Sequence, residues 1–148
     1  RLVQHFVAPN KDRSIFRKNI GRCLLNQDGD PFLTTWNLDL TSRKSKQLHK
    51  GAVDSPKQQA VEKRVSQYIQ ERFSFTVIPV QDKAKRLEIE SKLVSTVSLC
   101  QHCGPSKTWL GLSSPIKKIR ESGLWQVNEL YKTPFSNEDL PELQMLLG

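Results

Sequence analysis

FSFTVIPV, residues 73–80, is the stretch on which the fold prediction depends. It is rich in aromatic and β-branched residues that alternate along the chain, a pattern typical of a β-strand. Helical patterns flank it at residues 56–72 and 83–99. A lone strand is not a sheet, so FLTTW (residues 32–36) or another chain must pair with it. The sequence therefore predicts an α+β fold, in which several helices flank a small antiparallel sheet and helix dominates.

The helix after this strand contains RLEIESKLVSTV, residues 86–97. Its apolar side chains recur at helical spacing on one face: Leu87, Leu93, Val94 and Val97. Glu90 lies in the middle of that face, whereas Glu88 points the other way. A buried, unpaired carboxylate costs several kcal/mol, on the order of the desolvation penalty of an ion. Glu90 is therefore expected to be paired with a Lys or Arg, to be protonated, or to hold a metal ion.

Charge and length limit the classes of function. The chain has 148 residues, enough for one domain with a real core, and its net charge of +8 with a pI of about 9.6 indicates an acidic partner. Nucleic acid is the commonest such partner, and an anionic membrane surface is the alternative. No segment has the apolar length of a transmembrane helix. Three cysteines in a chain without secretory features indicate free thiols and a reducing, cytoplasmic location.

The cationic side chains are spread over several segments. Simple solubility is one explanation, and contact with phosphates is the other, with Trp36 or Trp109 available to stack on bases. Residues 41–51, TSRKSKQLHKG, are expected to form a mobile surface loop. The candidates for DNA binding are Arg13, Arg17, Arg43, Lys44, Lys46, Lys107, Lys117 and Lys118, and Lys50 extends the same basic run.

Local capping chemistry predicts where several helices begin and end. Ser14 is expected to cap a helix at 14–25, Ser55 the helix at 56–72, and Asp82 the helix at 83–99. Gly123 is expected to stop a short helix by adopting a left-handed conformation. A last helix is predicted at 139–147.

Cys100 and Cys103 form a CxxC pair around His102. A structural zinc site needs four ligands, and the sequence has no second CxxC pair. Free thiols in a loop are therefore the default interpretation, and a zinc-binding interaction domain is the alternative in which these two cysteines are ligands.

The order of several motifs resembles the GIY-YIG endonuclease superfamily, in a branch with a long WLG-SP-I-SGLW-VN ending. The resemblance covers the chain up to about Leu130, and the Glu90 helix and SGLWQVNEL (residues 122–130) are its most specific parts. The motifs that carry it, in chain order, are Arg1 with His5 four residues later, SIFRKNIGRCLL, FSFTVIPV, RLEIESKLVS and WLGLSSPIKKIRESGLWQVNEL.

The resemblance implies a role for each matching residue. Arg1 would steady charge on the scissile phosphate, with His5 in support. Glu90 would bind a single divalent metal ion, Mg²⁺ or Mn²⁺, and Asn128 would support the site. The implied activity is hydrolysis of phosphodiester bonds in DNA, with no membrane partner.

One departure from the family pattern affects these implications. The family's two tyrosine-bearing strands precede the helix arginine, whereas this sequence has only Tyr68 and Tyr131, neither in such a context. The chain is therefore expected to be one GIY-YIG-like domain, residues 1–148, without its first two strands, inactive by itself, and with a helical extension from about residue 131. The alternative is a non-catalytic DNA-binding module on the same scaffold.

Overall fold

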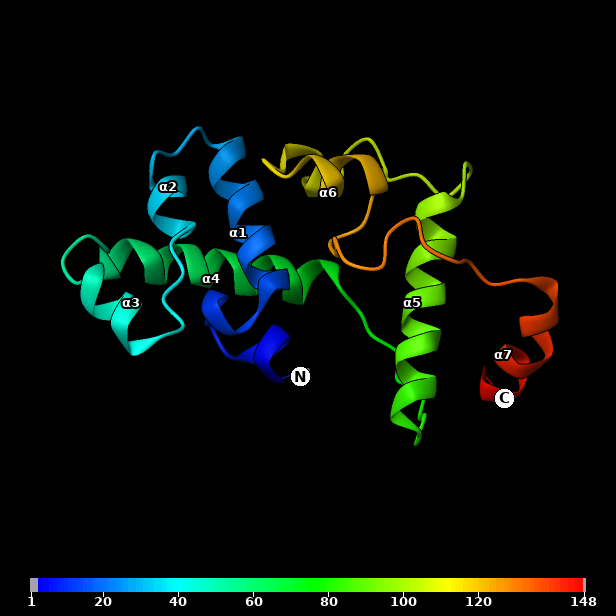
Figure 1. Cartoon of the computed structure of the whole chain (residues 1–148). Coiled ribbons are helices and arrows are strands. Elements are labelled where there is room, and N and C mark those ends of the chain that lie inside the picture. Colours follow the sequence, from blue (N-terminus) through cyan, green and yellow to red (C-terminus); the bar gives the residue numbers. More distant parts are fainter. Residues whose placement is uncertain (1–2, 148) are drawn as a thin grey trace.

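The computed structural model describes residues 3–147, which form helices joined by loops (Figure 1). Short turns of π- or 3-10 helix are named η. In chain order the elements are η1 (Val3–Val7), η2 (Lys11–Arg13), α1 (Ile15–Gln27), α2 (Phe32–Trp36), α3 (Arg43–Leu48), α4 (Ser55–Arg72), α5 (Lys83–Leu99), η3 (Leu110–Ser113), α6 (Lys117–Ser122), η4 (Asn137–Asp139) and α7 (Leu140–Leu147).

The predicted α+β fold is wrong for the described part of the chain, because residues 3–147 contain no strand. Residues 73–80 instead form an irregular connection between α4 and α5 (Figure 1). A β-prone pattern becomes a strand only when a partner completes its ladder of hydrogen bonds, and no described segment does so. Phe75 and Val77 remain 57% and 66% exposed.

Trp36 explains why residues 32–36 are helical and not the second strand. Its side chain is completely buried, and its indole Nε1 donates a hydrogen bond to the Lys18 carbonyl oxygen at 3.0 Å. The ring lies against α1 at Gly21, where an added Cβ would come within 2.3 Å of a ring carbon. Packing of this one side chain therefore overrides the β-propensity of its neighbours.

The main core lies between α1, α2, α4 and η3. The spacing that predicted the helices at 14–25 and 56–72 is confirmed by the side chains that these helices bury. The buried apolar cluster consists of Ile20, Cys23, Leu25, Trp36, Val61, Val65, Ile69 and Leu110.

Most of the predicted helix ends are confirmed. Ser14 accepts from the Arg17 backbone N–H at 3.2 Å, and Asp82 accepts from Lys85 at 2.7 Å. Gly123 has a φ of 71° and ends α6 as expected. At α4 the capping residue is Asp54, and not Ser55. The basic segment 41–51 contains α3, where a loop was expected.

A buried ion pair joins α1 to α4 inside this core. The guanidinium of Arg17 donates to Glu62 Oε2 from Nη2 at 2.9 Å and from Nε at 3.1 Å. It also donates to the carbonyl oxygen of His5 at 3.0 Å and to Ser66 Oγ at 2.7 Å. Glu62 Oε1 accepts from the Lys11 backbone N–H as well. Both charged groups of this pair are therefore buried and hydrogen-bonded within the protein.

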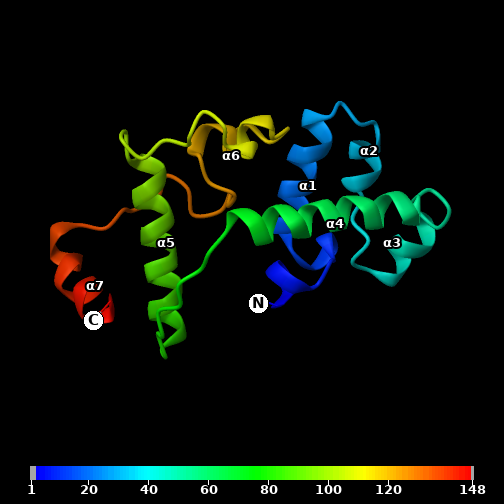
Figure 2. The ribbon, with the colours of Figure 1, turned by 180° about the vertical axis from the view of Figure 1, so that it is seen from behind.

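α5 stands apart from the α1–α4 body, and α7 lies on its far side (Figures 1 and 2). Ion pairs attach the C-terminal part to α5: Lys92 lies 2.6 Å from Asp139, and Lys85 lies 2.5 Å from Glu142. Hydrogen bonds from Lys92 and Ser136 lower the pKa of Asp139 to about 2. This attachment therefore keeps its charge well into the acid range.

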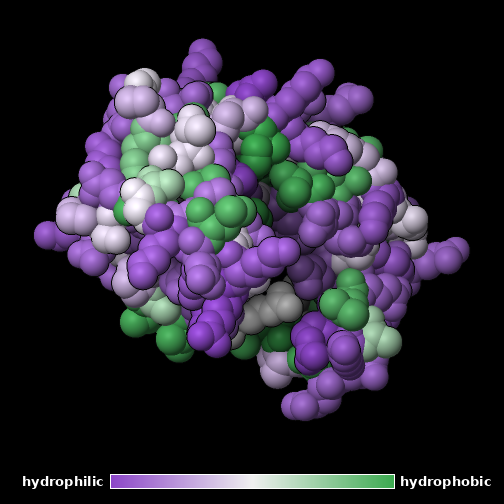
Figure 3. All heavy atoms as spheres, turned by 60° about the vertical axis from the view of Figure 1, so that its left-hand side comes forward, coloured by the Kyte–Doolittle hydropathy of each residue, from purple (hydrophilic) through white to green (hydrophobic). Residues whose placement is uncertain are grey.

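Hydrophilic residues cover most of the face shown in Figure 3, and hydrophobic residues gather there in separate patches. Among the helices of residues 3–147, none combines the length and the apolar character needed to cross a bilayer.

The ion pair gives a stability prediction. Glu62→Ala should lower the free energy of unfolding by about 3–5 kcal/mol, because the Arg17 charge would stay buried without its partner. Glu88→Ala, which removes a carboxylate from exposed ion pairs, should cost less than about 1 kcal/mol. Denaturant unfolding measures both values. Similar losses in the two variants would contradict the proposal that Glu62 stabilises the fold by neutralising the buried Arg17.

Candidate functional site

A groove of about 620 Å³ lies between α1 and α5, with residues 124–128 contributing to its wall. Its lining is mainly apolar, with a few polar groups, which is the usual character of a ligand site. The polar lining residues are His5, Asn19, Glu90, Gln126 and Asn128, and the apolar ones are Ile15, Phe16, Leu93, Val94, Val97, Leu124, Trp125 and Val127.

This groove brings together three of the four residues that the resemblance places in the site. His5 comes from η1, Glu90 from α5, and Asn128 from the segment after α6. These positions are far apart in the sequence, and only the fold collects them. Arg1, the fourth, lies outside the described residues.

Glu90 is exposed and has no ion pair within residues 3–147. The Gln126 side-chain amide donates to its Oε1 at 3.4 Å. The burial argument for this residue was wrong, because the apolar face around it is not part of the core: Leu93 lines the groove and is 39% exposed, and Leu87 lies outside the groove and is 54% exposed. α5 buries Ile89 instead.

Glu88 has the structural role that was considered for Glu90. Its carboxylate lies 3.0 Å from Lys92 Nζ and 3.3 Å from Lys85 Nζ. Hydrogen bonds from these two ammonium groups, Lys92 first, lower its pKa. The two glutamates of α5 therefore differ sharply: one is neutralised by lysines, and the other faces the groove.

The residues next to Glu90 and Asn128 are bonded to each other. Ser91 Oγ donates to the Glu129 carboxylate at 2.5 Å, and Lys132 Nζ donates to the same carboxylate at 2.8 Å. Glu129 has a φ of 64°, in the left-handed region that costs a non-glycine residue of order 1 kcal/mol or more. The backbone turn after Asn128 is thus held in an unusual conformation by a contact to α5.

His5 is fixed in position by the start of α1. Its Nδ1 lies 2.7 Å from Ser14 Oγ, and its ring packs edge-on against Phe16 with 5.9 Å between the centroids. Its carbonyl oxygen accepts from Arg17, the arginine of the buried ion pair. The imidazole is therefore oriented by both its ring contacts and its backbone.

The donor set suits a hard, hydrated cation better than zinc. Within residues 3–147 no group of three or more His, Cys, Asp or Glu side chains is close enough to hold a metal ion. Mg²⁺ commonly uses one or two carboxylates, several waters and phosphate oxygens of the substrate. The exposed carboxylate of Glu90 in an open groove fits that pattern, with the amide oxygen of Asn128 on the same groove.

Cys23, Cys100 and Cys103 are free thiols. Cys23 belongs to the core, where burial raises the pKa of its thiol to about 11. A side-chain hydrogen bond with Cys103 is the main cause of a lowered pKa at Cys100.

The predicted DNA-binding residues are not equivalent in the structure. The guanidinium of Arg17 is buried in the ion pair with Glu62, so Arg17 cannot contact DNA and is not part of the DNA-binding surface. Trp36 is buried and does not present a face for stacking, whereas Trp109 is half-buried against Trp125. The remaining candidates are exposed: Arg13, Arg43, Lys44, Lys46, Lys107, Lys117 and Lys118.

Sequence reasoning missed Gln126, Ser91 and Glu129. Gln126 lies within the SGLWQVNEL block, and that block was the available signal. Ser91 and Glu129 each follow a predicted site residue directly, but nothing in one sequence indicates that they meet.

The contact between these two residues can be tested without any assumption about activity. Ser91→Ala should loosen the turn at residues 128–131, because a hydrogen bond to a carboxylate contributes about 1 kcal/mol or more. The Tyr131 N–H, which donates to Ser98 Oγ at 2.9 Å, should then exchange with solvent about fivefold faster. Exchange measured by NMR checks this. Ser74→Ala, at an exposed position in the α4–α5 connection, is the matched control. An unchanged Tyr131 rate in Ser91→Ala would refute the proposed restraint.

Comparison with known proteins gives one result. The family model described as the GIY-YIG domain matches residues 1–147. No curated protein and no solved structure matches the chain. Because the family match extends over almost the whole sequence, the chain belongs to the GIY-YIG domain family.

Proposed function

We propose that this protein is a divalent-metal-dependent DNA endonuclease that hydrolyses phosphodiester bonds. Membership of the GIY-YIG family supports a nuclease-type function and interaction with DNA. The observation that carries the proposal furthest is the groove lined by His5, Glu90 and Asn128, in which Glu90 has no cationic partner among the described residues.

Each residue would have a distinct task. Glu90 would hold the metal ion, which when bound supplies positive charge for phosphate oxygens and lowers the pKa of a bound water. His5, oriented by Ser14, would donate or accept a hydrogen bond at the reacting phosphate. Asn128 would position a ligand through its amide. Arg1 takes its role from the family resemblance, as a cation beside the scissile phosphate.

The shape of the groove favours this chemistry. Its apolar wall includes Phe16, Val94 and Trp125, and a few polar groups stand among these residues where they can orient a ligand. The overall positive charge of the chain would draw DNA toward the protein.

Two further parts of the proposal concern organisation and location. Residues 1–148 would form one nuclease domain, in which the segment from about residue 131 is a helical extension attached to α5. Three free cysteines favour a reducing compartment, and we propose the cytoplasm.

Glu90→Gln in the complete protein tests the catalytic assignment. We expect metal-dependent cleavage to fall at least about a hundredfold, because a neutral amide holds a divalent ion poorly. DNA affinity and thermal stability should stay near those of the unaltered protein, since Glu90 is exposed and has no ion pair in residues 3–147. Cleavage assays in Mg²⁺ and Mn²⁺, binding assays and thermal unfolding provide the three readouts.

Glu88→Gln is the matched control, two residues away on the same helix and outside the groove lining. It should leave cleavage nearly unchanged. Equal losses of cleavage in the two variants would contradict the role of Glu90. DNA binding without cleavage by the unaltered complete protein would favour the alternative, a non-catalytic DNA-binding module.

The electrostatic part of the proposal predicts a salt dependence. DNA affinity should fall at least about tenfold between about 50 and 200 mM salt, the loss expected when roughly two phosphates are neutralised. Fluorescence anisotropy with a labelled duplex measures this. Affinity that stays constant over the range would argue against a nucleic-acid partner.

A further inference from the structure

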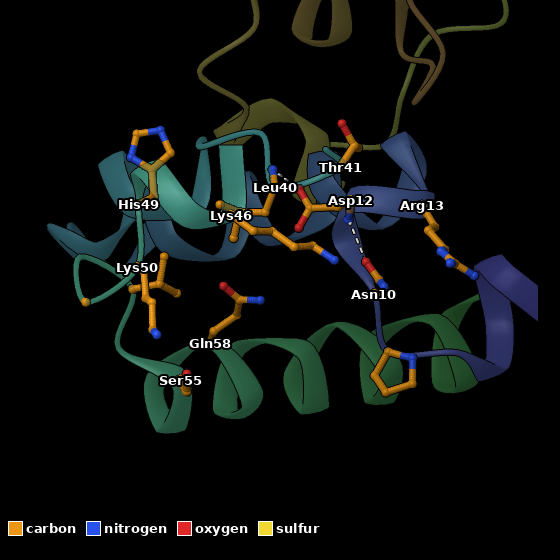
Figure 4. A pocket seen from close by; sticks show the side chains of 13 residues that line it. Asn10, Asp12, Arg13, Leu40, Thr41, Lys46, His49, Lys50, Ser55 and Gln58 are labelled. Carbon is orange, nitrogen blue, oxygen red and sulfur yellow. Dashed lines mark hydrogen bonds between the residues drawn. The ribbon is translucent and has the colours of Figure 1, made fainter. Parts of the chain in front are cut away.

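A second hollow, which we call the basic cleft, lies between η2, α3 and the beginning of α4 (Figure 4). Its volume of about 500 Å³ is within the range of ordinary small-ligand sites. Figure 4 shows Lys46 reaching from α3 into the space above α4, and Gln58 pointing into the same space from α4. The cleft is thus bounded by separate elements and is more than a surface cluster of charge.

The cations of the cleft are not neutralised by the protein. Arg13, Lys46 and Lys50 line it, and none of them has an ion pair within residues 3–147. The one acidic lining residue, Asp12, accepts hydrogen bonds from Lys11 Nζ at 2.8 Å and from the Leu40 backbone N–H at 3.3 Å. Its charge is therefore already balanced, and the cleft as a whole attracts anions.

This arrangement differs from that of two lysines on α5. Lys85 and Lys92 each form ion pairs with two carboxylates, at nitrogen–oxygen distances of 2.5 to 3.3 Å. In the cleft Lys46 reaches into the hollow, and Arg13 and Lys50 lie at its edges, so a bound anion could supply the charge that neutralises them.

Gln58 gives an independent indication. Its Oε1 is buried, and within the described residues it has no hydrogen-bond partner. An unsatisfied polar atom of this kind requires an explanation, and a donor brought by a ligand is one. A nucleotide carries both complementary groups: phosphate oxygens for the lysines, and exocyclic amino groups or bound water for the amide oxygen.

The basic cleft and the groove adjoin the same short segment of chain. Asn10, Asp12 and Arg13 line the cleft, whereas His5 and Ile15 line the groove. Ser14, between Arg13 and Ile15, contacts His5 at 2.7 Å. The segment from His5 to Ile15 therefore contributes to both hollows.

We propose that the basic cleft anchors phosphates of the DNA next to the bond that is cut, through Arg13, Lys46 and Lys50. This inference rests on the nuclease function proposed above. It assigns the cleft a positioning role: it fixes the register of the DNA strand relative to the groove and takes no part in the chemistry.

The test compares two double variants of the complete protein. Lys46→Gln with Lys50→Gln removes two charges from the cleft, and Lys63→Gln with Lys83→Gln removes two exposed charges elsewhere. Binding of a labelled duplex is measured between about 50 and 200 mM salt. The cleft variant should bind at least about tenfold more weakly, and its slope of log affinity against log salt should fall by about 2. The control variant should change both quantities much less.

A second measurement needs no variant. Bound DNA should protect Lys46 and Lys50 from acetylation, and should leave Lys63 and Lys83 reactive, as read by mass spectrometry. In cleavage assays the cleft variant should show a raised KM with little change in kcat, which loss of fold would not produce.

Each outcome has a defined meaning. Equal weakening in both double variants, or no protection of Lys46 and Lys50, would overturn the anchoring site. Vesicles containing phosphatidylserine that bind through the cleft, while DNA binding is unaffected by the cleft variant, would overturn it in favour of lipid. Cleft-dependent DNA binding without any cleavage by the unaltered protein would overturn the nuclease proposal alone. Absence of DNA binding would overturn both.

Discussion

The buried ion pair between Arg17 and Glu62 is the contact on which the arrangement of the N-terminal half depends. Its hydrogen bonds join α1 to α4 and reach the backbone of η1 through the carbonyl oxygen of His5. An ion pair in a low-dielectric interior stabilises a fold only when its remaining polar atoms also find partners, and here they do. This network is rigid, because a movement of either charged side chain would break hydrogen bonds to the other elements. Because Arg17 also bonds the carbonyl oxygen of His5, the network fixes the position of His5 on the wall of the groove.

The opposite wall is held quite differently. α5 is attached through the segment after α6, by bonds such as those from Ser91 to Glu129 and from Tyr131 to Ser98, and it shares little with the main core. The groove therefore has one wall that is held by a buried network and another that is held by exposed or partly buried hydrogen bonds. Low-stability elements of this kind are where proteins open most easily. The width of the groove depends on the weaker of the two attachments.

Local signals in the sequence were reliable where a few neighbouring residues decide the outcome. The caps at Ser14 and Asp82 and the stop at Gly123 depend on chemistry within one turn of helix, and all three are confirmed. The predicted strand at 73–80 and its predicted partner at 32–36 depend on contacts elsewhere in the chain, and both predictions were wrong, because the first segment is irregular and the second is helical. Trp36 shows why: its burial against Gly21 is a tertiary contact that no local pattern contains. The position of Glu90 in the groove came from the family resemblance, and the argument from its burial gave the wrong reason.

The exposed connection between α4 and α5 also affects how the protein behaves in concentrated solution. Phe75 and Val77 belong to a β-prone stretch that presents unpaired backbone groups, which is the feature through which chains add to one another edge to edge. Pro79 interrupts the stretch, since a proline cannot donate to a ladder. The net charge of +8 opposes close approach of two molecules at low ionic strength. Colloidal stability should therefore decline as salt screens that repulsion.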